Sequence, residues 1–236
     1  MSIYQPNKFK IRAWLVHFYT SLGLITGLLA IIAIVEQNAN LAFFWLGLAL
    51  IIDATDGTLA RKYKVSFYIP NFDGRKLDDI TDYLNYAFIP MFFIWRFEIV
   101  TGFWVYVLPF ILLSAVYGFC QSEAKTDDGY FTGFPNFWNV LVLYLFIFNW
   151  STLVNGIVLL VLAFLVFVPI KFVSFSTPGK VKIAKSLSFL YFAFLIMIVL
   201  YESPLLALFS LIFPLIYFGY AIYISASKRK LLFTGS

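Results

Sequence analysis

The chain has 236 residues, of which 62% are hydrophobic and only 12% are charged, and its mean hydropathy is +0.88. Soluble domains carry about 25% charged residues, so this composition excludes an ordinary water-soluble enzyme and indicates a protein of the lipid bilayer. The net charge of +5 is not gathered on a soluble face, which argues against a nucleic-acid-binding protein.

The N-terminal segment 1–17 combines basic residues with aromatic and apolar ones, as in "NKFKIRAWLVH" at residues 7–17. This pattern fits a helix that lies in the membrane interface, and it fits equally well a segment that only flanks the first span. The single histidine, His17, has no second metal ligand at helical spacing, so the sequence gives it no chemical role.

Long apolar runs in residues 18–225 predict about eight transmembrane helices, and a basic tail follows at 226–236. The predicted spans are 18–35, 41–61, 76–95, 102–121, 136–150, 153–170, 184–200 and 204–225. The fifth and sixth spans share a run of 30 nearly continuous apolar residues. As one helix this run would be about 45 Å long, too long for a hydrocarbon core of ~30 Å. The polar letters "NWSTLVNG" inside it therefore predict a tight hairpin.

Positive charge predicts the orientation, because cytoplasmic loops carry an excess of Lys and Arg. With eight spans and both termini in the cytoplasm, 16 of the 17 basic residues lie on the cytoplasmic side, and only Arg96 lies outside. Merging the fifth and sixth spans would move the last seven basic residues outside. The charge distribution therefore favours eight spans with both ends in the cytoplasm.

Six of the 12 acidic residues lie between positions 53 and 82, and all six are Asp. They are Asp53, Asp56, Asp73, Asp78, Asp79 and Asp82. One helical face, with spacing i, i+3, i+4 and i+7, holds Asp53, Asp56, Gly57 and Ala60. A second face, with spacing i, i+4 and i+8, holds Gly74, Asp78 and Asp82. Because Pro70 in the linker can turn the chain back, we expect two antiparallel helices to gather Asp53, Asp56, Asp78 and Asp82 near the cytoplasmic end of the membrane.

Four clustered carboxylates repel one another unless they bind protons or divalent cations. Oxygen ligands suit hard cations such as Mg²⁺ or Mn²⁺, and four Asp side chains can hold two ions ~3.5–4 Å apart, an arrangement that acts on phosphate esters. Gly57 and Ala60 leave room for a bulky ligand, and Arg61 is placed to meet its phosphates. A solvated charged loop is the alternative for Asp73 and Asp79. A cation or proton carrier is the alternative for the cluster, although carriers usually place acids near the midplane on several helices.

The pattern Asp53-x2-Asp56-Gly57-x2-Ala60-Arg61, then 12 residues, then Gly74-x3-Asp78-x3-Asp82, resembles the signature of CDP-alcohol phosphotransferases. The resemblance implies an all-α integral membrane enzyme with a six-helix core, a cytoplasmic active site and a homodimer. Such an enzyme displaces CMP from a CDP-activated partner with an alcohol. The resemblance further implies metal binding by Asp53, Asp56, Asp78 and Asp82, with Asp82 also the general base. It implies a CDP pocket lined by Asp56, Gly57, Ala60, Arg61 and Gly74.

Two segments, "EAKTDDGYFTGFPNFWNVLVLYLF" and "DGRKLDDITDYLNYAFIP", resemble those of bacterial phosphatidylcholine synthases within that family. This resemblance implies that CDP-diacylglycerol and choline give phosphatidylcholine and CMP at the bacterial inner membrane, with Mn²⁺ often preferred. Serine, inositol or glycerol phosphate are alternative acceptors. Choline has no N–H to donate, so we expect aromatic faces to hold it by cation–π contacts. The candidates are Tyr83, Tyr86, Tyr130, Phe131 and Trp138, with Glu123 as a distant carboxylate.

Overall fold

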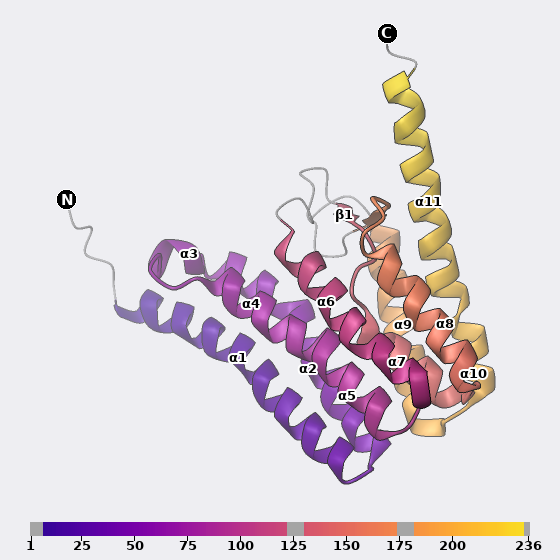
Figure 1. The fold of residues 1–236 in the computed structure, drawn as a ribbon. Coiled ribbons are helices and arrows are strands. Elements are labelled where there is room, and N and C mark those ends of the chain that lie inside the picture. The colour runs from indigo at the N-terminus through magenta and orange to yellow at the C-terminus, as the bar shows by residue number, and fades with distance from the viewer. Residues whose placement is uncertain (1–6, 122–129, 174–181, 234–236) are drawn as a thin grey trace. The chain divides into compact units, whose positions relative to one another are not determined.

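The computed structural model describes residues 7–121, 130–173 and 182–233 of the chain (Figure 1). The regular secondary structure of these residues is helical apart from one pair of short strands, so the predicted all-α class is confirmed. The chain forms two compact units, Met1–Arg96 and Phe97–Ser236, and each is described by itself.

The first unit is built around its N-terminal helix. Its elements are α1 (Asn7–Val35), α2 (Ala39–Lys62), α3 (Val65–Tyr68), α4 (Gly74–Tyr83), the π-helical turn η1 (Leu84–Phe88) and α5 (Ile89–Arg96). Helix α1 contacts every other element of the unit, and Figure 1 shows α1 in indigo along the helices that follow it. Residues 7–17 are the first turns of α1 and continue directly into the predicted first span. Their location in the interface, and the bounds 1–17, 18–225 and 226–236, stay predictions.

Two glycines let α1 approach the helix that carries half of the acidic cluster. A Cβ on Gly23 would lie 2.5 Å from Thr81 Cγ2, and a Cβ on Gly27 would lie 2.8 Å from Asn85 Oδ1. The Asn85 side-chain amide donates a hydrogen bond of 3.0 Å to the Gly23 carbonyl. Small residues at four-residue spacing and interhelical polar contacts are the usual means of helix association in membranes. The α4–η1 segment is therefore fixed closely against α1.

The start of α4 is fixed by a cap and by an aromatic group. Asp73 is the N-cap, and its carboxylate accepts a hydrogen bond of 3.0 Å from the Lys76 backbone N–H. Asp is among the preferred N-cap residues because it satisfies an otherwise unpaired N–H. The His17 ring packs on Phe72, with ring centroids 4.4 Å apart, and on Trp14 at 5.7 Å. These contacts attach the beginning of α4 to α1.

The second unit holds the remaining apolar helices and the strand pair. Its elements are the 3₁₀ helix η2 (Gly102–Tyr106), α6 (Val107–Cys120), β1 (Tyr130–Thr132), α7 (Trp138–Phe148), α8 (Thr152–Leu165), β2 (Lys171–Val173), α9 (Lys182–Tyr201), α10 (Pro204–Ser210) and α11 (Ile212–Phe233). Strands β1 and β2 pair antiparallel, with Phe131 opposite Phe172. The Tyr144 hydroxyl bonds to Tyr191 at 3.1 Å and to Ser210 at 2.7 Å, which joins α7, α9 and α10 by buried polar contacts.

A helical segment lies at each of the eight predicted spans. Among the described residues, four helical stretches are long and apolar enough to cross a membrane: Asn7–Val35, Ala39–Lys62, Gly102–Cys120 and Pro204–Ser227. Shorter apolar helices are Trp138–Phe148, Thr152–Leu165 and Leu190–Tyr201. The predicted third span is divided among α4, η1 and α5. The predicted hairpin lies between α7 and α8, where Asn149 has a left-handed backbone (φ 46°) and Ser151 caps α8.

Candidate active site

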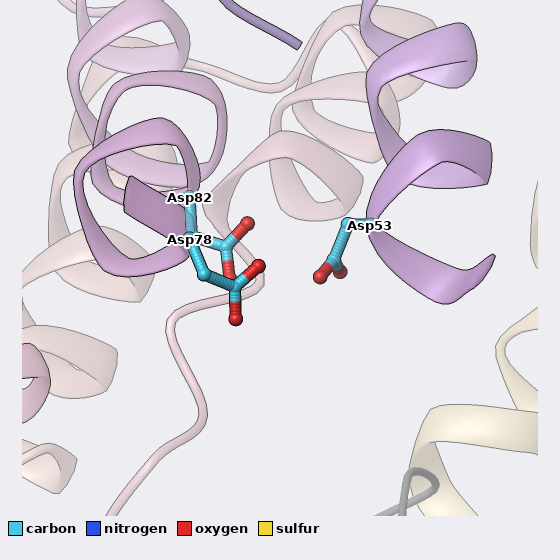
Figure 2. A group of neighbouring side chains, drawn as sticks. All are labelled: Asp53, Asp78 and Asp82. Carbon is cyan, nitrogen blue, oxygen red and sulfur yellow. The ribbon is translucent and has the colours of Figure 1, made fainter. Parts of the chain in front are cut away.

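Three carboxylates from two helices face one another in the first unit. Asp53 comes from α2, and Asp78 and Asp82 come from successive turns of α4. One oxygen from each carboxylate lies within 4.8 Å of the other two. Figure 2 shows the Asp78 and Asp82 carboxylates directed across the gap toward Asp53. The two predicted helical faces therefore meet, and three of the four predicted metal ligands come together.

Asp56 lies beside this group rather than in it. Its side chain is only 5% exposed, and it interacts with the side chains of Asp78 and Thr20. Arg61 is near enough to interact electrostatically with Asp56, and its guanidinium donates a hydrogen bond of 3.2 Å to the Thr58 hydroxyl. The charge of Arg61 is therefore present at the end of α2 where the sequence predicts phosphate binding, while metal binding by Asp56 stays a prediction.

A pocket contains all four predicted ligands together with residues that the sequence did not single out. It is lined by Thr20, Ala49, Ile52, Asp53, Asp56, Asp78, Thr81, Asp82, Asn85 and Tyr86. The unexpected polar members are Thr20, Thr81 and Asn85, all of which are buried. Burying a polar side chain within an apolar run is unfavourable in free energy unless the side chain has a partner or a function. Polar residues at such positions are therefore the sequence signal by which these three residues could have been identified.

The small residues of the predicted CDP pocket have different neighbours. A Cβ on Gly57 would meet only the Arg61 guanidinium, at 3.4 Å, so the α2 surface beside Asp56 is open. A Cβ on Gly74 would lie 2.6 Å from His17 Cε1, so this glycine makes room for a ring of the same chain. Ala60 packs partly on a buried cluster of Ala13, Val16, Val65 and Ile69. Gly57 is thus the position with space for a ligand.

The predicted choline residues are distributed over both units. Tyr83 is half-buried at the end of α4, while Tyr86 is 6% exposed and its hydroxyl donates a hydrogen bond of 2.6 Å to Asp53 Oδ2. In the second unit Trp138 is fully buried and packs edge-on against Phe134, and Tyr130 and Phe131 lie in β1. Glu123 lies outside the described residues. The choline-binding role of this set stays a prediction.

The electrostatics of the three facing carboxylates require a counter-charge. Two unit charges 4 Å apart repel by about 4 kcal/mol at an effective dielectric constant of 20. Half-buried carboxylates at this spacing therefore bind protons or cations. The ligands are all oxygen atoms, the donor type that hard divalent cations prefer. The cluster Asp53, Asp78 and Asp82 accordingly fits a divalent metal ion.

Comparison with known sequences identifies the family. The sequence model of the CDP-alcohol phosphatidyltransferases matches residues 14–168, a range that includes the whole acidic cluster and its pocket. The chain belongs to this family. CDP-alcohol phosphatidyltransferases are membrane enzymes that depend on divalent metal ions and act on a CDP-alcohol substrate and an alcohol acceptor, so this chain is a transferase of phospholipid biosynthesis. The predicted family is confirmed.

Several curated relatives of this phosphatidyltransferase carry the same name, phosphatidylcholine synthase. The relative from Borreliella burgdorferi is 45% identical over 173 residues, which are 73% of each chain. The relative from Pseudomonas aeruginosa is 43% identical over 164 residues, 69% of each chain. The relative from Rhizobium meliloti is 35% identical over 175 residues, 73% of this chain and 71% of its own. The similarity therefore extends over most of both sequences.

Proposed function

We propose that this enzyme is a phosphatidylcholine synthase that transfers the phosphatidyl group of CDP-diacylglycerol to choline and releases CMP. The observation that carries the proposal is the facing carboxylate cluster within a sequence 45% identical to a curated phosphatidylcholine synthase. The apolar helices of the chain suit a substrate whose acyl chains stay in the bilayer while its diphosphate reaches the carboxylates.

The metal centre is proposed to hold two Mn²⁺ or Mg²⁺ ions between α2 and α4. Asp53, Asp78 and Asp82 supply the facing oxygens, and buried Asp56 completes the set next to Asp78. When bound, the ions neutralise the diphosphate and polarise the phosphorus that is attacked. The donor set supports the proposal because it contains oxygen atoms alone and because the carboxylates repel one another without a cation.

The remaining steps follow from the residues of the pocket. Arg61 binds a phosphate oxygen of the CDP moiety, and the open surface at Gly57 admits the diphosphate close to the α2 backbone. Asp82 accepts the proton of the choline hydroxyl. The hydroxyl oxygen forms a bond to the lipid-side phosphorus, the bond from that phosphorus to the CMP oxygen breaks, and CMP leaves. Ala60 and Gly74 are proposed to border the same CDP pocket.

Choline is proposed to bind to aromatic faces, because its trimethylammonium group offers charge and shape but no N–H. Tyr83 is the candidate best placed for this role in the first unit, since it directly follows Asp82 and is half-buried. Changing Tyr83 to Leu tests the role through the choline KM. Serine would instead require a cation for its carboxylate, and inositol a ring of polar partners. These differences make the acceptor testable.

The location and assembly are proposed from charge and family. With the eight predicted spans, 16 of the 17 basic residues lie on one side, which supports both termini and the active site facing the cytoplasm. The bacterial inner membrane is proposed from the resemblance to bacterial relatives. The six-helix core and a homodimer are proposed from the family. Light scattering of the purified protein tests the dimer, for which a monomer mass at working concentration would be the contrary result.

The acceptor is tested with purified protein, CDP-diacylglycerol and Mn²⁺. CMP release is measured with choline, serine, inositol or glycerol phosphate as the only acceptor. Release that depends on choline, with phosphatidylcholine as the lipid product, is the expected result. Release with serine in place of choline would refute the choline acceptor and leave the family chemistry intact. Ion transport by reconstituted vesicles without CMP release would favour a carrier.

A further inference from the structure

The hydroxyl of Tyr86 is directed at a carboxylate of the proposed metal centre. It donates to Asp53 Oδ2 over 2.6 Å, a length typical of strong hydrogen bonds between a hydroxyl and a charged carboxylate. Tyr86 lies in η1 and Asp53 in α2, 33 positions earlier, so the bond joins the two halves of the cluster. The phenol is therefore a fixed contact between the helix of Asp53 and the helix segment that follows Asp82.

The backbone at Tyr86 is unusual in a way that bears on this contact. Residues 84–88 form a π-helical turn between α4 and α5, and Tyr86 is at its centre. Such turns are rare and occur frequently at functional sites. Tyr86 is 6% exposed, and it lines the same pocket as Asp53 and Asp82. The widened turn thus places a buried phenol within the site rather than in the lipid-facing surface.

We infer that Tyr86 is a positioning residue of the metal centre, which orients the Asp53 carboxylate toward Asp78 and Asp82 through the hydrogen bond to Oδ2. This inference rests on the proposed function of the carboxylates as metal ligands. A ligating carboxylate has four lone-pair sites, so a bond to Oδ2 leaves the acceptor capacity that a cation needs. Partners of this kind fix the direction of the ligand, and their loss typically costs 10- to 100-fold in metal affinity or activity.

The inference differs from the sequence prediction for this residue. The sequence predicts that the ring face of Tyr86 contacts choline, whereas the structure gives its hydroxyl a partner in the metal cluster. The substitution Tyr86→Phe separates the two roles, because it keeps the ring face and removes the hydroxyl. A cation–π role survives this change, while a role through the hydrogen bond does not.

The chain offers a matched control. Tyr19 on α1 shares a hydrogen bond of 2.8 Å with the hydroxyl of Thr55, two residues after Asp53 on α2. The variant Tyr19→Phe therefore also removes one phenol hydroxyl bonded to α2, but that bond does not reach a carboxylate of the cluster. Any general effect of losing an interhelical phenol hydrogen bond appears in both variants.

The test measures Mn²⁺ binding to the purified full-length protein by the loss of the free-ion EPR signal, without lipid or choline. Tyr86→Phe is expected to raise the Mn²⁺ dissociation constant 10- to 100-fold, and Tyr19→Phe less than about 3-fold. The choline KM of Tyr86→Phe at saturating Mn²⁺ is expected to stay within about 3-fold of the wild-type value. If Tyr86→Phe is obtained in small amounts, the rise of its melting temperature on adding Mn²⁺ gives the same comparison, because a tighter ligand stabilises more.

Three contrary results are distinguishable. Equal Mn²⁺ affinity in the wild type and in Tyr86→Phe would overturn the positioning role while leaving the proposed metal centre standing. A wild-type protein that binds no Mn²⁺ or Mg²⁺ would overturn the metal centre itself. A choline KM that rises in Tyr86→Phe without a change in Mn²⁺ affinity would also overturn the inference and assign Tyr86 to the acceptor.

Discussion

Replacing Gly74 by Ala probes the contact that attaches the start of α4 to α1. The new Cβ would lie 2.6 Å from Cε1 and 3.2 Å from Nδ1 of His17, whereas carbon atoms in contact prefer about 3.5–4.0 Å. The imidazole has Phe72 on one side at 4.4 Å and Trp14 at 5.7 Å between ring centroids, so it cannot simply rotate away. We therefore expect the first turn of α4 to move.

The loss of stability can be estimated from the steric overlap between the new Cβ and the His17 ring. Overpacking of this kind costs typically about 1–3 kcal/mol, and 1 kcal/mol shifts the melting temperature of a 150–250-residue protein by about 2–4 °C. Gly74→Ala should therefore melt roughly 2–12 °C below the wild type. Asp78 and Asp82 follow Gly74 on the same face, and a displacement of ~1 Å at a reacting group can cost about 100-fold in rate. A comparable fall in kcat is expected.

A second substitution tests whether contact with the His17 ring causes the loss of stability and rate in Gly74→Ala. His17→Ala removes the ring that the new methyl group meets, so the double variant should recover most of the stability and rate that Gly74→Ala loses. Gly47→Ala on α2 is the control, since nothing lies within 4 Å of its Cβ. The assay is thermal unfolding in detergent together with CMP release. Loss of rate in Gly74→Ala without loss of stability, and without recovery in the double variant, would refute the steric clash with His17 as the cause and leave the proposed contact of Gly74 with CDP as the explanation.

The remaining predictions concern the chemistry and the topology. Asp82→Asn should lower turnover about 10²–10⁴-fold while CDP-lipid binding persists. The control Asp79→Asn changes an exposed residue of the same helix and should keep turnover near that of the wild type. Near-normal turnover in Asp82→Asn would exclude Asp82 as the general base. EDTA should abolish CMP release and excess Mn²⁺ or Mg²⁺ should restore it, whereas activity in protein shown to be metal-free would contradict the metal centre. In intact cells, a tag at either terminus should be protected from protease added outside. Cleavage of a C-terminal tag under these conditions would mean that the predicted number of spans is wrong. Tyr83→Leu should raise the choline KM roughly 2- to 30-fold without changing the KM for CDP-diacylglycerol, and an unchanged choline KM would count against that aromatic contact.

The features that the sequence predicts well depend on spacing within one element. The faces that carry Asp53, Asp78 and Asp82 follow from a period of 3.6 residues, and the described helices α2 and α4 have that period. The positions of the apolar helices follow from run lengths set by the bilayer thickness. The hairpin at Asn149 follows from polar residues within an apolar run that is too long for one span.

The features that the sequence does not predict depend on contacts between distant residues. No periodicity relates His17 to Gly74, or Tyr86 to Asp53, and these pairs form only when α1, α2, α4 and η1 pack together. His17 therefore has no role in the sequence prediction, although its ring accounts for a glycine of the motif. The π-helical turn at 84–88 and the three-residue strands are likewise missed, since neither is long enough to give a repeating pattern.

The placement of the acidic cluster depends on hydrogen bonds donated by two uncharged side chains beside it, Asn85 and Tyr86. Apolar surface gives little driving force between helices in a bilayer, because lipid chains are as apolar as the side chains, so close packing and polar contacts must set the geometry. When ionised, Asp53 repels Asp78 and Asp82 unless a proton or a cation is bound, and this repulsion favours separation of α2 from α4. The Tyr86 hydroxyl bonded to Asp53 opposes that separation directly, because it joins η1 to α2. The Asn85 amide bonded to the Gly23 carbonyl opposes it indirectly, because it holds η1 against α1, which packs on α2. These two contacts therefore keep the three carboxylates close together without a cation, so that an ion bound at the proposed metal centre would not use up its binding free energy in bringing the helices together.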